Sequence, residues 1–461
     1  MFTGRKKELG FLEEHYGKGG SQLLVVYGHK GVGKTSLALR FARNKSLRYY
    51  IARACSEEEQ RLCWQREVEK LPEVPGRETL SRAAREKEGF ESILCRIAAS
   101  SEDKPVIVID EFQNIIKYST GFMPALSEFL KKSDVPCLVL LLSSSISFVE
   151  TDFVPRIGAL ALGITAFYKL PELGFMDCVN FFKDYTTRQC MEVYSLLGGI
   201  PAYWNCFRGD ISVEENIKKN ILAPGCLLRE EAERVVAADL RELNVYCTLL
   251  GGLSDGKNKL NDLHLHTGFS RAKISVYLKN LMERELVEKV FPFDNASSIN
   301  AKKGIYRMEL RLLEFYFRFM FKNLSALEIT DTEEFYAKYV APGLDSFHQG
   351  NFRKVCGEYL DILNQNKMLP FVATRNGEWV GKEGSIDIVM QDDDWESLLA
   401  FCNWELPEVG EDQLKKALKV AEAARLHPDH LYMFAAGHFS QELKAFAEAN
   451  AYVTLIDIDT L

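Results

Sequence analysis

Short apolar runs alternate with longer amphipathic segments over the first part of the chain. The runs QLLVVY, PVIVID and CLVLLLS have the composition of buried strands, whereas TSLALRFARN, which follows the first of them, spaces its apolar residues as an amphipathic helix does. The most apolar stretch, CLVLLLSSSISFV, is well short of the roughly 20 residues that cross a bilayer. We therefore expect a parallel sheet covered by helices and no membrane span.

The pattern near the end of the chain predicts a second α/β core. A helix in APGLDSFHQGNFRKVCGEYLDIL is followed by the extended segments LPFVAT, GSIDIVM and SLLAFCNW, helix EDQLKKALKVAEAARL, strand LYMFAA, helix SQELKAFAEA and strand YVTLIDI. Period-2 alternation in SLLAFCNW puts Leu399, Phe401 and Asn403 on one face and Ala400, Cys402 and Trp404 on the other.

Composition and charge limit the kinds of protein to consider. The 461 residues, 47% hydrophobic and 26% charged, are enough for two to four cores. The formal net charge of -8 argues against a globally basic nucleic-acid coat, so any DNA contact must be local. Eleven cysteines without a Cys-x-x-Cys pair, and an N-terminus without an apolar core, favour a reducing cytoplasm.

The strongest motif is the loop between the first apolar run and its helix. Gly28, Gly33, Lys34 and Thr35 match G-x-x-x-x-G-K-[ST]. The full loop comprises Gly28, His29, Lys30, Gly31, Val32, Gly33, Lys34, Thr35 and Ser36. In such a P-loop the backbone N–H groups cradle phosphates, the lysine reaches the β and γ phosphates, and the Thr35 hydroxyl ligates Mg²⁺. The sequence therefore predicts binding of ATP or ADP.

Two acids follow the run Val106 to Ile109. Asp110 is placed to hold Mg²⁺ through water, and Glu111 to polarise the attacking water. Alone, this pair also suits a solvated strand end; together with the P-loop it indicates ATP hydrolysis, with Glu111 and Lys34 as the catalytic candidates.

At this point the chain resembles the archaeal-type ATPases of the AAA+/STAND class, which are related to origin-recognition ATPases. FTGRKKEL is similar to the family's opening motif, which implies Arg5 near the nucleotide. LVLLLSSSIS resembles the sensor strand, which implies Ser144 or Ser145 at the γ-phosphate. LLGGIPAYW is similar to a signature of the helical lid that contains Pro201. Read without the family, these are an N-terminal cap, a turn, and a helix break with an aromatic anchor.

The chain departs from the family where relatives carry an arginine after a Leu-Tyr-Gly segment. Here Ile164 follows Gly163, and Arg156 is nearby but reads better as an exposed structural residue. Without a cation, the charge that develops on the transferred phosphoryl group is less stabilised. We therefore expect slow turnover, or an arginine supplied by a partner.

The segment from Asn244 to Phe293 has the rhythm of a winged helix-turn-helix, with Ser270 capping the second helix. Ile274, Leu278 and Leu281 fall on its core face. The candidate contacts to double-stranded DNA are Arg271, Lys273 and Lys279, and a protein partner fits equally well. His264 and His266 lack a third ligand, which favours a solvated pair over a metal site.

The last core resembles a restriction-endonuclease-like (PD-(D/E)XK-type) domain, which implies an Asp on one strand and Glu-x-Lys on the next. Asp387 is present, but Phe401 and Asn403 occupy the other two positions. A phenyl ring cannot ligate Mg²⁺, and an amide carries no positive charge. We therefore expect no cutting, unless Glu358, roughly 120° from the apolar stripe of its helix, or Glu405 supplies the missing acid.

These inferences divide the chain into a P-loop ATPase domain (1–165), a helical lid (166–235), a winged helix (236–300), an aromatic helical connector (301–340) and the last α/β domain (341–461). We expect a slow ATP-hydrolysing switch that uses ATP and Mg²⁺. The alternatives are a DNA-binding regulator with a structural nucleotide and an active ATP-regulated nuclease.

Overall fold

The structure, a computed structural model, describes residues 3–71, 88–238, 240–293 and 304–461. The chain forms two compact units. The first comprises the residues up to Leu173 together with Ile200–Ala202, and the second comprises Gly174–Gly199 and Tyr203–Leu461. The short segment Ile200–Ala202 therefore packs with a part of the chain that ended some 30 residues earlier.

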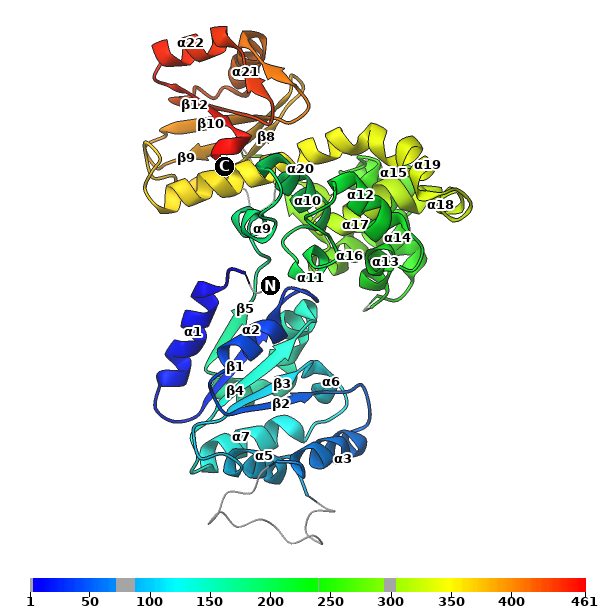
Figure 1. Cartoon of the computed structure of the whole chain (residues 1–461), viewed down its shortest axis with the longest axis vertical. Helices are drawn as coiled ribbons and strands as arrows, with labels where there is room; N and C mark the ends of the chain where they lie inside the picture. The colour runs from blue at the N-terminus through cyan, green and yellow to red at the C-terminus, as the bar shows by residue number, and fades with distance from the viewer. Residues whose placement is uncertain (1–2, 72–87, 239, 294–303) are drawn as a thin grey trace. The chain divides into compact units, whose positions relative to one another are not determined.

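The first unit is built on a parallel five-stranded sheet in the order β2-β3-β4-β1-β5 (Figure 1). Its elements are α1 (Lys6–Gly17), β1 (Gln22–Tyr27), α2 (Lys34–Phe41), β2 (Leu47–Ile51), α3 (Glu57–Val68), α5 (Phe90–Ala99), β3 (Val106–Asp110), α6 (Gln113–Ile116), α7 (Phe122–Lys132), β4 (Leu138–Ser143), η1 (Phe148–Phe153), α8 (Val154–Ile157), η2 (Gly158–Gly163) and β5 (Ala166–Lys169). The expected α/β fold with a parallel sheet is confirmed. Strand β5 extends this sheet beyond residue 165, where the first domain was expected to end.

Alternate residues of the strands enter two different cores. Leu24 and Val26 of β1 pack with α1 and α2, whereas Leu23 and Val25 pack with α3, α5 and α7 on the other face. The central strands β3 and β4 are buried along their whole length because helices cover both faces. Since the strands are parallel, β1, β3 and β4 all end at the same edge, where the loop after β1 lies.

The second unit begins with helices. They are α9 (Phe175–Phe181), α10 (Thr187–Leu197), α11 (Pro201–Trp204, whose first two residues belong to the first unit), α12 (Val213–Ile217), η3 (Lys218–Leu222), α13 (Leu227–Ala237), α14 (Leu243–Ser254), α15 (Leu260–Thr267) and α16 (Arg271–Met282). A two-stranded antiparallel hairpin follows, β6 (Val287–Val290) with β7 (Ile305–Met308). Ile274, Leu278 and Leu281 of α16 are fully buried, as expected.

The connector that was expected to be helical over 301–340 includes β7, and its helices begin at Arg311. They are α17 (Arg311–Phe315), η5 (Tyr316–Met320), η6 (Phe321–Asn323), α18 (Leu324–Ile329), α19 (Thr332–Phe335) and η7 (Tyr336–Val340). Phe315, Phe317 and Phe319 are buried.

The chain ends in a second five-stranded sheet, in the order β14-β12-β10-β9-β8. Its elements are α20 (Ala341–Gln365), β8 (Arg375–Val380), β9 (Ser385–Gln391), β10 (Ser397–Asn403), β11 (Glu408–Val409), α21 (Glu411–Ala424), β12 (His430–Ala435), β13 (His438–Phe439), α22 (Gln441–Ala449), β14 (Val453–Asp457) and η8 (Ile458–Thr460). The pairs β10-β12 and β12-β14 are parallel, and β8 and β9 are antiparallel to their neighbours. The expected strand at LPFVAT was wrong: the first strand is the next segment, RNGEWV.

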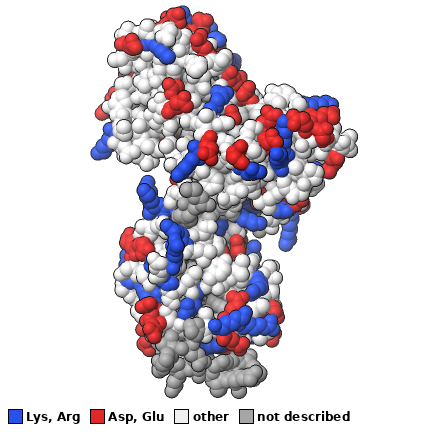
Figure 2. All heavy atoms as spheres, viewed as in Figure 1, with Lys and Arg blue, Asp and Glu red and all other residues white. Residues whose placement is uncertain are grey.

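Within the described part of the chain, no helix combines the length and the apolar character needed to cross a bilayer. Figure 2 shows Lys and Arg interspersed with Asp and Glu on the visible face of each unit. That mixture agrees with 57 basic against 65 acidic residues.

Candidate nucleotide site

The loop after β1 is shaped by glycines and ends in a helix. A Cβ on Gly28 would lie 2.6 Å from the Leu170 carbonyl oxygen, so no larger residue fits there. Helix α2 begins at Lys34, directly after Gly33. The unpaired N–H groups of the first helical turn therefore face the loop, which is the arrangement that binds anions at helix N-termini.

Lys34 is buried inside this loop, with 5% of its surface exposed. Its Nζ donates to the carbonyl oxygens of Gly28 and His29, both at 2.9 Å. Burial lowers the pKa of Lys34 to about 8, although the nearby carboxylates of Glu111 and Asp110 act in the opposite direction. The ammonium group thus lacks strong anionic compensation and is suited to an anionic ligand.

Asp110, at the end of β3, accepts three hydrogen bonds. The Thr35 hydroxyl donates to Oδ2 at 2.6 Å, the Tyr49 hydroxyl donates to the same oxygen at 2.8 Å, and the Glu111 N–H donates to Oδ1 at 2.9 Å. The residues proposed from the sequence for Mg²⁺, Thr35 and Asp110, are therefore in direct contact. Both offer hard oxygen atoms, which Mg²⁺ prefers.

Glu111 has a left-handed backbone conformation, with φ of 53°, which is uncommon outside glycine. Its Oε2 accepts from the Ser144 hydroxyl at 2.7 Å and from the Gln113 side-chain amide. The Gln113 Oε1 is buried and has no partner among the described residues. The structure thus brings Glu111 to Ser144 at the end of β4, and adds Gln113, which the sequence had not suggested.

Arg5, the N-cap of α1, contacts the loop at Val32. Its guanidinium donates to Glu8 Oε1 at 2.8 Å and to the Val32 carbonyl oxygen at 3.0 Å, and only 7% of the residue is exposed. Arg5 therefore links the start of α1 to the phosphate loop. Arg156, by contrast, is exposed on the short helix α8.

The segment Ile200–Ala202, which contains Pro201, packs on the same loop within the first unit. The Ala202 N–H donates to the Gly31 carbonyl oxygen at 3.3 Å. A Cβ on Gly31, where φ is 83°, would lie 2.8 Å from the Ala202 Cβ. A glycine at position 31 is thus required by a contact from about 170 residues along the chain as well as by its backbone angle.

The three candidate DNA contacts lie on or beside α16, and each has an intramolecular neighbour. Arg271 donates to Asn261, the Lys273 ammonium lies 4.8 Å from the Phe269 ring centroid, and Lys279 is 3.7 Å from Glu283. His264 and His266 do not converge on one point: His264 Nδ1 lies 2.7 Å from the Phe269 carbonyl oxygen, and His266 faces Asp255.

Asp387, the acid proposed from the sequence for the last domain, contacts the backbone of the next strand. Asp387 Oδ2 accepts from the Cys402 N–H at 2.9 Å, and burial raises the pKa of Asp387. Phe401 packs in the apolar core beside Leu399, as the alternation predicted. Within the described ranges, no group of three or more His, Cys, Asp or Glu side chains is placed to hold a metal ion.

Glu358, which the sequence left open as a possible acid for this domain, is held by residues of α9 and α10. Its carboxylate accepts from the Tyr194 hydroxyl at 2.9 Å and from the Phe175 N–H at 3.2 Å, so it ties α20 to α9 and α10. Glu405 is exposed.

Two contributors to the nucleotide site escaped the sequence interpretation. Tyr49 lies on an edge strand in a segment, LRYYI, that has no motif, and Gln113 follows Glu111 by two residues in the short helix that begins there. A polar residue two positions after the strand-end acid Glu111 was a usable signal for Gln113. Only the pairing of β2 with β3 places Tyr49 near Asp110.

Comparisons with known proteins agree with this geometry. Residues 2–205 match a family described as an ATPase domain predominantly from Archaea, and residues 316–417 match a family of archaeal and bacterial proteins of unknown function. An uncharacterized protein of Methanocaldococcus jannaschii is 28% identical over 409 residues, which is 88% of each chain. An uncharacterized ATP-binding protein of the same organism is 42% identical over 48 residues, covering 10% of this chain and 81% of that protein.

Among solved structures, the Walker-type ATPase of Pyrococcus abyssi is similar, with a TM-score of 0.51 at 16% identity, covering 69% of this chain and 96% of that one. This likeness shows a shared fold. The family match and the fold together support an archaeal-type P-loop ATPase domain over residues 2–205 of this chain.

Proposed function

We propose that the first unit binds ATP with Mg²⁺ and hydrolyses it slowly, so that the chain works as a nucleotide-dependent switch of the AAA+/STAND class. One observation carries the proposal: two hydrogen-bonded pairs, Thr35 with Asp110 and Glu111 with Ser144, join the phosphate loop and the ends of β3 and β4 at one edge of the sheet. Catalysis of phosphoryl transfer depends mainly on positioning and charge stabilisation, which is what such an edge supplies.

Each group has a distinct role in this proposal. The loop N–H groups and the Lys34 ammonium bind the phosphates. Thr35 and Asp110 hold Mg²⁺, which when bound neutralises charge on the phosphate oxygens. Glu111 orients and polarises the attacking water, and Ser144 fixes the position of that carboxylate.

Slow turnover follows from the two positions where a cation was expected at the phosphates. Ile164 occupies the position where relatives carry arginine, and the Arg5 guanidinium is already held by Glu8 and Val32. Where an arginine finger is present, it increases the rate of hydrolysis by about 10³- to 10⁵-fold. A partner that supplies an arginine would therefore accelerate hydrolysis.

The contact of Ile200–Ala202 with the loop supports a switch. That segment continues directly from α10, which in the second unit contacts the last domain: Arg188 donates to the Ala436 carbonyl oxygen at 3.1 Å, and its guanidinium lies 4.3 Å from the Trp404 ring centroid. A change in the loop on nucleotide binding would be passed along this continuous stretch of chain.

Two variants test the assignment. Lys34→Ala should greatly weaken ATP binding, whereas Glu111→Gln should bind ATP like the wild type and lose hydrolysis, because one residue holds phosphates and the other orients water. Binding is measured by titration calorimetry and hydrolysis by phosphate release. Equal ATP affinity in Lys34→Ala and wild type would refute the proposal.

Double-stranded DNA is a second candidate ligand, favoured by the arrangement of α15, the turn at Gly268 and α16 followed by the hairpin β6-β7, which we interpret as a winged helix. The exposed side of α16 presents Arg271 and Lys279 beside the small residue Ser275. Replacing Arg271, Lys273 and Lys279 together by alanine should weaken binding at all sequences and flatten its salt dependence. If the wild type binds no DNA, a protein is the partner of this surface.

We further propose that the last domain has a restriction-endonuclease-like fold that no longer cuts. Three features support this: Asp387 bonds to the backbone of β10, Phe401 is part of the apolar core, and Glu358 serves another contact. The protein should not cleave DNA or RNA with Mg²⁺ or Mn²⁺, with or without ATP. Cleavage that is lost in Asp387→Ala would establish the alternative, an ATP-regulated nuclease.

A further inference from the structure

Among the residues that the structure describes, Tyr49 contributes a hydrogen bond to the Asp110 carboxylate from outside both the phosphate loop and the chain next to Asp110. It comes from the middle of edge strand β2, whose pairing with β3 places Ile51 opposite Asp110. The Tyr49 hydroxyl donates to Asp110 Oδ2 at 2.8 Å, the same oxygen that accepts from Thr35 at 2.6 Å. Two hydroxyl groups from two different elements thus converge on one carboxylate oxygen.

The proton on this hydroxyl is held firmly. A carboxylate oxygen can only accept, and a tyrosine hydroxyl, whose ordinary pKa is about 10, keeps its proton at physiological pH, so the 2.8 Å contact is a hydrogen bond from Tyr49 to Asp110. Tyr49 therefore acts as a permanent donor to Asp110.

The hydrogen bond from Tyr49 limits how many further groups the Asp110 carboxylate can bind. A carboxylate offers about four lone-pair sites, and the three hydrogen bonds from Tyr49, Thr35 and the Glu111 N–H occupy three of them. The site that remains suits one further donor, such as a metal-bound water. The same bonds oppose the rotation that would bring the carboxylate itself onto the metal.

We propose that Tyr49 is a positioning residue for the metal site: it holds Asp110 in the orientation from which it accepts a hydrogen bond from Mg²⁺-bound water and keeps it from direct ligation. This inference rests on the proposed function of the site. Residues of this kind, which orient the groups around a metal, typically change metal affinity or activity by about 10- to 100-fold when removed.

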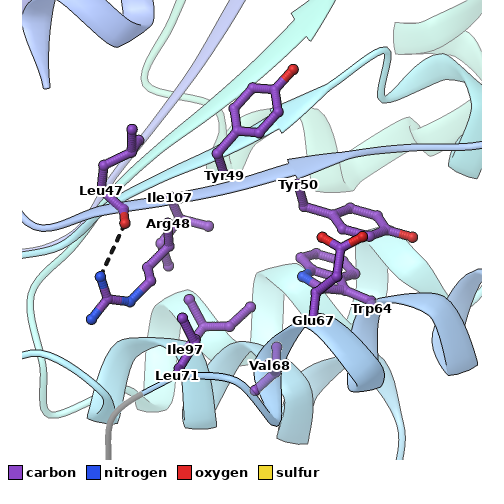
Figure 3. A pocket seen from close by; sticks show the side chains of 10 residues that line it. All are labelled: Leu47, Arg48, Tyr49, Tyr50, Trp64, Glu67, Val68, Leu71, Ile97 and Ile107. Carbon is purple, nitrogen blue, oxygen red and sulfur yellow. Dashed lines mark hydrogen bonds between the residues drawn. The ribbon is translucent and has the colours of Figure 1, made fainter.

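The neighbouring residue provides a matched control. Figure 3 shows the Tyr49 and Tyr50 side chains on opposite sides of β2; both residues are among those that line a cavity of about 90 Å³. Tyr50 stacks on Trp64 with ring centroids 4.5 Å apart, and its hydroxyl donates to the Gln60 carbonyl oxygen at 3.2 Å. Tyr50→Phe thus removes the same atom from the same strand, on the side away from Asp110.

The test is the affinity of the full-length protein for a fluorescent N-methylanthraniloyl-ADP, measured in EDTA and then during a Mg²⁺ titration. We expect Tyr49→Phe to bind the nucleotide in EDTA like the wild type. It should need about tenfold more Mg²⁺ to reach half of the increase in nucleotide affinity that Mg²⁺ causes. Tyr50→Phe should follow the wild type throughout. Thermal melting of all three proteins without nucleotide checks that the fold is retained.

Four results would overturn the inference. A Mg²⁺ titration of Tyr49→Phe that superimposes on the wild type removes the proposed role of the hydroxyl. If Tyr49→Phe loses as much nucleotide affinity in EDTA as it does in Mg²⁺, Tyr49 acts on the nucleotide or on the fold instead. If the wild type binds the nucleotide but gains no affinity from Mg²⁺, this inference fails while nucleotide binding stands; if it binds no nucleotide at all, the proposed function fails as well.

Discussion

The buried ammonium of Lys34 predicts a distinctive pH dependence of ATP binding. Its pKa is lowered from 10.5 to about 8 because the group is desolvated and its Nζ has only neutral carbonyl partners, those of Gly28 and His29. Bound phosphates would supply the negative charge that the loop lacks and raise this pKa again. Above about pH 8 the free protein must therefore take up a proton to bind ATP, and affinity should fall about tenfold per pH unit.

Burial of the charged Lys34 ammonium also lowers the free energy of unfolding when no nucleotide is bound. Each unit of pKa difference is worth about 1.4 kcal/mol, so the lowering from 10.5 to about 8 corresponds to about 3 kcal/mol. Below pH 8 the lysine is charged in both folded and unfolded chains, and the folded state bears this cost in full. Between about pH 8 and 10.5 only the unfolded chain keeps the proton, so the cost is relieved as pH rises. Lys34→Met should accordingly melt several degrees higher than wild type at pH 7 without nucleotide.

The assay is calorimetric titration with ATP from pH 7.5 to 9.5 in buffers of different ionisation enthalpy, which counts the protons taken up. Lys34→Arg is the control, because a guanidinium stays charged throughout this range. Its affinity, whatever its absolute value, should not vary with pH in the same way. A flat profile for the wild type, or an identical slope for Lys34→Arg, would refute the argument.

Three further variants are informative. Gly31→Ala should be destabilised by about 1–2 kcal/mol, because alanine is strained at the left-handed backbone angle of this position. It should also lose ATP affinity, because the added methyl group meets Ala202. Gly19→Ala, which has open space around it, is the control for thermal melting and for binding. Gln113→Ala should lower turnover about tenfold through loss of orientation at Glu111 with unchanged ATP affinity, so equal turnover in a phosphate-release assay would contradict its role. Glu358→Ala should lower stability to urea by about 1–3 kcal/mol without affecting ATP binding, and a stability equal to wild type would mean that its two hydrogen bonds contribute nothing.

The sequence by itself determined the features whose residues are neighbours in the chain. The phosphate loop from Gly28 to Ser36, the apolar strand ending in Asp110 and the capped helix that begins after Ser270 depend on local backbone angles and on strand or helix periodicity. The order of strands and helices in the last domain followed from the same periodicity, apart from the first strand. There LPFVAT is the more apolar segment, yet RNGEWV forms the strand because it pairs with β9.

Only the tertiary structure decided which distant groups meet. Glu358 lies to one side of the apolar stripe of α20, a position equally compatible with the Asp387 region or with α10, and the packing of Tyr194 and Phe175 selects the second. Ile200–Ala202 reaches Gly31, and Tyr49 reaches Asp110, across more than 60 residues of sequence in each case. Such contacts depend on the order and register of strands, which arise from burial summed over the whole sheet, and periodicity within one segment carries no information about them.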